Sequence, residues 1–115
     1  MTLTEQDLGT AWLIELEGEA DLAAVPELRR ALHARRAAAT RMLLVDFSKV
    51  TFVNTPVWAL LIEYYQWASK NDAKFALTGL QGRALASFET VQLGTFISHY
   101  PDVDEALRRL ARAMS

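Results

Sequence analysis

A single threonine, Thr55, stands at the start of a predicted helix and carries a hydroxyl group that could accept a phosphate. It follows a mostly apolar segment and precedes Pro56. Proline is favoured at the first position of a helix, because its missing N–H would have no partner there. The pattern predicts that Thr55 is the N-cap, with its hydroxyl at the positive end of the helix dipole. A phosphate on that hydroxyl would meet free backbone N–H groups and a favourable field.

The other reactive side chains form no catalytic arrangement. His33 lies among arginines on a predicted helix, His99 stands far away at a strand end, and the chain has no cysteine. These residues do not make a metal site of the usual histidine and cysteine type. The segment 79–82 lacks the spacing of a phosphate-binding glycine motif. We therefore expect no enzymatic activity, no metal and no cofactor.

Length and composition limit the class of protein. The 115 residues predict one domain, residues 1–115, with a core that needs no disulfides. The net charge of −2 does not favour nucleic acid or an anionic membrane. We expect a cytoplasmic protein, because cysteine is absent, the N-terminus does not look like a signal peptide, and no apolar run is long enough to cross a bilayer.

Apolar periodicity predicts an alternation of strands and helices. Strands are expected near residue 3 and at 12–18, 42–47, 74–78 and 96–100. Helices are expected at 21–38, 56–70, 81–92 and 102–113. Residues 48–54 read as a connector, and Leu22 reads as part of the buried stripe of the first helix. The alternation predicts an α/β domain with a mixed, largely parallel sheet of four to five strands and about four helices.

Five segments, in order and at the right spacing, resemble the STAS domain of bacterial anti-sigma-factor antagonists. They are Gly18–Leu22 with Pro26, Val45–Val50, Asn54–Val57, Leu93–Ile97 and Val103–Leu107. The resemblance covers nearly the whole chain and implies the STAS fold. It also implies a regulatory protein whose phosphate acceptor is Thr55, with Asp21 and Asp46 supporting the loop around it.

In that family a kinase partner, often the anti-sigma factor itself, phosphorylates the acceptor. The unmodified form binds the partner and releases a sigma factor, and the phosphorylated form lets the partner go. This chain departs from the family at two positions: Asn54 replaces the usual aspartate and Val57 replaces the usual glycine. Three alternatives stay open: Thr55 is only a helix cap, the chain is a constitutive subunit of an assembly such as a phospholipid-transport ABC complex, or the chain is an enzyme or a small-ligand sensor.

The helix after Thr55 has two apolar stripes. One stripe consists of Trp58, Leu61, Ile62 and Tyr65, and the other of Val57, Leu60, Tyr64 and Trp67. The resemblance implies that the first stripe packs on the sheet. We expect the second to be at least partly exposed and, with Asn54, Thr55 and Pro56, to bind a partner protein or a second copy of the chain. The alternative is that a neighbouring helix covers it.

Overall fold

Strands that follow one another in the chain also lie side by side in the sheet. The structure, a computed structural model, describes residues 1–114 and the side chains of residues 1–111. The strands are β1 (Thr2–Asp7), β2 (Trp12–Ala20), β3 (Met42–Val53), β4 (Lys74–Thr78) and β5 (Ser98–Tyr100). β1 is antiparallel to β2, and the other neighbours are parallel. This five-stranded mixed sheet confirms the predicted fold class.

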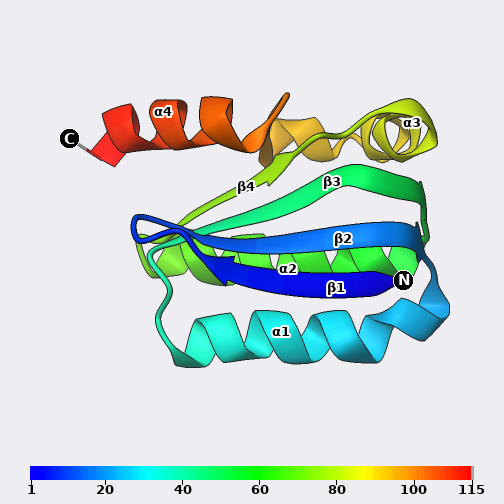
Figure 1. Ribbon diagram of the computed structural model, residues 1–115, viewed down its shortest axis with the longest axis horizontal. Helices are drawn as coiled ribbons and strands as arrows, with labels where there is room; N and C mark the ends of the chain where they lie inside the picture. Colours follow the sequence, from blue (N-terminus) through cyan, green and yellow to red (C-terminus); the bar gives the residue numbers. More distant parts are fainter. Residues whose placement is uncertain (115) are drawn as a thin grey trace.

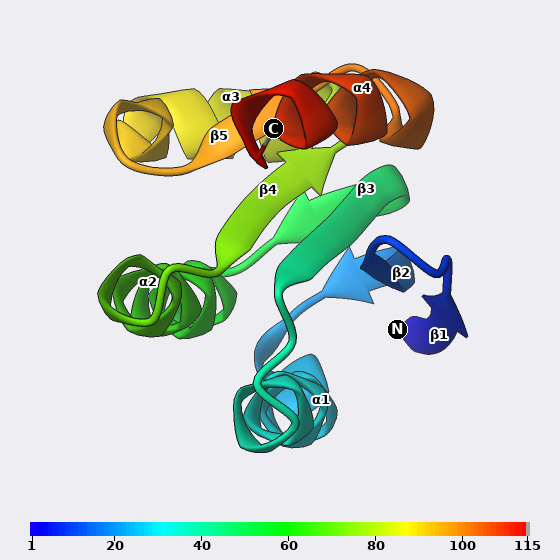
Figure 2. The same ribbon diagram turned by 90° about the vertical axis from the view of Figure 1, so that its left-hand side faces the viewer.

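Helices pack against both faces of the sheet. They are α1 (Val25–Ala37), α2 (Thr55–Lys70), α3 (Gly82–Thr90) and α4 (Val103–Met114), with 3₁₀ turns η1 (Leu22–Ala24) and η2 (Leu93–Thr95). Figures 1 and 2 show α1 and α2 on one side of the sheet and α4 on the other. The larger apolar core joins the sheet to α1, α2 and α3, and a smaller core joins it to α4.

The central strand β3 is longer than its apolar run predicts. Residues 48–53, expected as a connector, continue the strand and pair with the end of β2, where Gly18 lies opposite Val50. The pairing shifts register twice along this stretch. Val50 is buried while Ser48 and Lys49 are exposed, so this half of the strand has one solvated face and lacks a continuous apolar signal.

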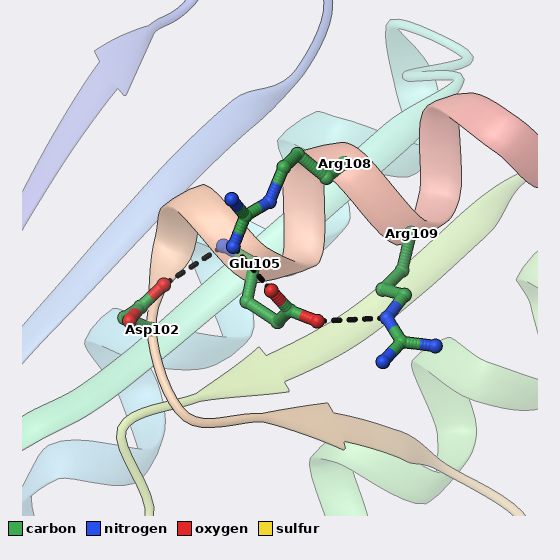
Figure 3. A network of polar contacts seen from close by, with 4 residues as sticks. All are labelled: Asp102, Glu105, Arg108 and Arg109. Atoms are coloured by element: carbon green, nitrogen blue, oxygen red, sulfur yellow. Dashed lines mark hydrogen bonds and ion pairs between the residues drawn. The ribbon is translucent and has the colours of Figure 1, made fainter.

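The C-terminal helix begins as predicted, at a capping aspartate. The Asp102 carboxylate accepts a hydrogen bond of 2.8 Å from the Glu105 N–H, which is the usual N-cap arrangement. The Glu105 carboxylate in turn binds Arg108 and Arg109 on the next turn, and its bond from Arg109 Nε is 2.7 Å long (Figure 3). These hydrogen bonds lower the pKa of Glu105, and the bond from Arg109 has the larger effect.

Candidate functional site

The helix α2 begins one residue earlier than the sequence predicts. Asn54 is the N-cap, and its Oδ1 accepts a hydrogen bond of 2.8 Å from the Thr55 N–H. Thr55 is therefore the first helical residue and not the cap, and Pro56 is the second. The expectation fails because proline is tolerated throughout the first turn, where none of the N–H groups has an intrahelical partner.

Backbone hydrogen bonds fasten this helix start to the sheet. The Asn54 N–H donates to the Ala20 carbonyl at the end of β2, over 2.9 Å. The Asn54 carbonyl accepts from the Val57 N–H over 3.0 Å. The end of β2, the end of β3 and the start of α2 therefore form one rigid corner.

The hydroxyl of Thr55 is available for chemistry. The Thr55 residue is exposed, whereas Asn54 and Pro56 are half-buried. No hydrogen bond links the Thr55 hydroxyl to any residue that the structure describes. An exposed, unpaired hydroxyl at the positive end of a helix is a suitable acceptor for a phosphoryl group.

The second apolar stripe of α2 does not form an exposed surface. Val57, Leu60 and Tyr64 are buried, and only Trp67 is half-buried. The expected exposure is wrong because α1 lies alongside α2 on the same face of the sheet, as Figure 2 shows, and because Tyr64 also packs on Phe75 of β4, with 5.0 Å between the ring centroids. Leu28 and Leu32 of α1 belong to the same core. The alternative that a neighbouring helix covers the stripe is confirmed.

The tyrosine in this covered stripe is an unpaired polar group in the core. The Tyr64 hydroxyl is buried without a hydrogen-bond partner among the described residues. Burial raises the pKa of Tyr64 to about 12, although Arg35 and Arg36 act in the opposite direction. A buried hydroxyl without a partner reduces stability, since it has lost its bonds to water.

Removing that hydroxyl should stabilise the protein. Tyr64→Phe is expected to raise the free energy of unfolding by about 1 kcal/mol at neutral pH. The raised pKa has a further consequence, because the unfolded tyrosine ionises near pH 10 and the folded one only near 12. Ionisation of Tyr64 therefore lowers the free energy of unfolding of the parent protein as the pH rises from 10 to 12. The free energy of unfolding of Tyr64→Phe should fall less over this range. Urea unfolding at neutral and alkaline pH measures both effects, and a destabilised variant would show that a bound water satisfies the hydroxyl.

The two aspartates expected to support the loop lie in different places. Asp21 precedes η1, and its side chain makes no capping bond. Asp46 lies inside β3, where its carboxylate accepts bonds of 2.5 Å from Ser48 Oγ and 2.7 Å from Thr78 Oγ1. Asp46 thus holds β3 to β4, and among its hydrogen bonds none reaches the segment 54–57. That either aspartate supports the Thr55 loop stays a prediction.

Two residues near this corner carried no functional signal in the sequence. Leu22 lies in η1, which contacts α2, and it is 64% exposed instead of buried as predicted. Arg83 is exposed on α3, and the centre of its guanidinium lies 5.4 Å from the centroid of the Phe52 ring. Both side chains are thus exposed, Leu22 on a turn that contacts α2 and Arg83 near the end of β3.

In the part of the chain that the structure describes, no group of three or more histidine and acidic side chains is arranged to hold a metal ion. No helix in the same part is long and apolar enough to span a membrane.

Comparison with known proteins identifies the family. The model of the STAS domain family matches residues 3–106. The chain therefore belongs to the STAS domain family. No curated protein sequence matches it significantly.

Solved structures show which STAS proteins it is similar to. An anti-sigma factor antagonist from Mycobacterium paratuberculosis has a TM-score of 0.87 and 23% identity, over 94% of this chain and 92% of that chain. The anti-sigma factor antagonist SpoIIAA, unphosphorylated, has a TM-score of 0.82 and 18% identity, over 96% of each chain. Phosphorylated SpoIIAA from Bacillus has a TM-score of 0.74 and 17% identity, over 95% of this chain and 99% of that chain. At these identities the likeness shows the fold.

Proposed function

We propose that this protein is a cytoplasmic partner-switching regulator similar to the anti-sigma-factor antagonists, without catalytic activity of its own. Its partner is an anti-sigma factor or a related kinase-like protein, and phosphorylation of Thr55 controls the binding. The observation that carries the proposal is the exposed, unpaired hydroxyl of Thr55 at the first position of α2. SpoIIAA, which shares the fold, is known in unphosphorylated and phosphorylated forms.

The phosphorylation step needs only an ATP-bound kinase partner. Thr55 Oγ attacks the γ-phosphorus, so that a new O–P bond forms, the bond to the β-phosphate oxygen breaks and ADP leaves. The hydroxyl proton is released in the same reaction. The product carries about −1.5 to −2 charge where the free protein had a neutral hydroxyl.

The docking surface that we propose is smaller than the sequence predicted. It consists of Asn54, Thr55 and Pro56, joined by the exposed Leu22. Val57 and Leu60 support it from the core instead of touching a partner. A phosphate placed beside Leu22 in such an interface would have to be desolvated, which favours release of the partner.

The proposal predicts that the partner co-purified from the native host phosphorylates the protein at Thr55. Incubation with ATP, followed by phosphopeptide mapping, should place the phosphate in the peptide that contains Thr55 and should find none in Thr55→Val. A matched control is Thr95→Val, which removes another exposed threonine and should leave the labelling unchanged. If the co-purified protein is an ATPase subunit of a transporter and no phosphate appears, the constitutive-subunit alternative is correct.

A further inference from the structure

The strand β1 is an open edge of the sheet. It pairs only with β2, and Figure 2 shows it at the outer side of the sheet. Five of its six residues are exposed, and Leu3 is half-buried. β1 contains no proline and pairs with β2 without a bulge, so two features that commonly keep a further strand away are missing. The other edge strand, β5, has only three residues and is followed by Pro101.

The backbone of β1 presents unpaired hydrogen-bonding groups at this edge. Antiparallel strands exchange hydrogen bonds at every second residue pair. The Leu8 N–H donates to the Ala11 carbonyl over 2.8 Å where the hairpin turns, so the residues of β1 that bond to β2 have even numbers. The N–H and C=O groups of the odd-numbered residues therefore point away from β2, and these residues are Leu3, Glu5 and Asp7. Their groups can pair with an added strand.

The hairpin of β1 and β2 is strongly acidic. Residues 2–20 contain five acidic side chains and no lysine, arginine or histidine. The hairpin therefore carries more negative charge than the whole chain, whose net charge is −2. Glu5 Oε1 accepts a hydrogen bond of 2.9 Å from Trp12 Nε1, and Asp7 Oδ1 accepts one of 2.8 Å from the Gly9 N–H. Neither carboxylate has an ion pair with a residue that the structure describes.

The side chains along this edge favour a basic strand over a second copy of β1. Leu3, Glu5 and Asp7 lie on one face of β1, because side chains alternate along a strand. An added strand would therefore place every second side chain beside one of these three. If that strand were an antiparallel second β1, the register that uses all three residues would set Glu5 opposite Glu5. Like charges directly opposite each other are destabilising, whereas opposite charges stabilise the pair.

We propose that the free edge of β1 binds an extended basic segment of a partner protein, which joins the sheet as a sixth strand. The outward N–H and C=O groups supply the backbone hydrogen bonds. Glu5 and Asp7 select lysine or arginine at alternate positions of the segment. The surface does not include Thr55, so this inference is independent of the proposed function.

A synthetic seven-residue peptide of alternating valine and lysine, blocked at both ends, is a suitable probe. Isothermal titration calorimetry should show binding, and the double variant Glu5→Lys, Asp7→Lys should weaken it by about tenfold or more. The matched control Glu63→Lys, Glu89→Lys makes the same change in net charge at exposed positions on α2 and α3. It should bind within about twofold of the parent, since distant charges are screened. A peptide with glutamate in place of lysine should not bind.

Amide hydrogen exchange, followed by NMR on the full chain, tests whether the peptide adds as a strand. The N–H groups of Glu5 and Asp7 should exchange rapidly in the free protein and be protected in the complex. Those of Thr4 and Gln6 should be protected in both states, because they bond to β2. Absence of binding, or binding without this alternating protection, would overturn the proposal. Dimerisation that protects Glu5 and Asp7 without peptide would also overturn it, because a second copy would then be the occupant.

Discussion

Gly79→Ala is expected to lower the free energy of unfolding by about 3 kcal/mol, the largest stability effect that we predict. Gly79 ends β4 with a φ of +70°, a conformation that side chains rarely adopt. An added Cβ would lie 2.8 Å from both the backbone nitrogen and the Cβ of Ser48. Because the first of these atoms belongs to β3, the crowding cannot be relieved by rotating a side chain.

The crowding would also disturb the buried carboxylate that joins β3 and β4. The added Cβ would approach Asp46 Oδ1 to 3.0 Å, and this oxygen accepts the bond from Thr78. Asp46 and Thr78 are the buried polar residues of the described core. Weakening a bond to a buried carboxylate is costly, since water cannot replace the lost partner.

Gly9→Ala provides the matched control for this prediction. Gly9 has a φ of +85°, but an added Cβ would meet no atom within 4 Å. It should lose only the conformational strain, about 1 to 2 kcal/mol. Urea unfolding measures the free energy of unfolding of both variants and so separates strain from crowding. If both variants lose the same amount of stability, the contact with Ser48 is not destabilising.

Local sequence patterns predicted the parts of the fold that have a uniform environment. Residues 42–47 are apolar except for Asp46 and are all buried in the middle of the sheet. The second half of β3 was missed because exposed residues, such as Ser48 and Lys49, interrupt its apolar pattern. Its pairing partner, the end of β2, lies about thirty residues away. Long-range pairing of this kind leaves no periodic signal.

The environment of α2 shows the same limit for helices. Periodicity identified two apolar stripes, and the structure buries most of both, one with the aromatic pair Phe47 and Trp58 and the other beside α1. Which stripe a neighbouring helix covers depends on the relative position of α1 and α2. The periodicity of one helix does not indicate where another helix packs.

In the candidate site, too, the sequence identified some residues and missed others. Thr55 was identifiable because a hydroxyl before a proline at a helix start has a local chemical signature. Leu22 was not, since an exposed leucine reads as core. Its exposure on η1, in contact with α2, is revealed only by the packing.

Thr55→Glu is expected to weaken binding of the partner by about 100-fold, because it places an unpaired charge in the docking surface. The substitution should not destabilise the fold. Thr55 is exposed, and a carboxylate in the first turn of a helix is favourable by about 0.3 to 1 kcal/mol. Loss of affinity with unchanged or higher stability is therefore the result that a charge-controlled switch requires.

Isothermal titration calorimetry with the purified partner measures this affinity, and urea unfolding measures the stability. Thr55→Ala keeps the surface neutral and should bind within a few-fold of the parent protein. Thr95→Glu adds the same charge at an exposed position on η2 and should bind like the parent. If Thr55→Glu and Thr55→Ala bind alike, charge at this position does not control the interaction. Thr55 is then only a structural residue at the start of α2, and the interface is permanent.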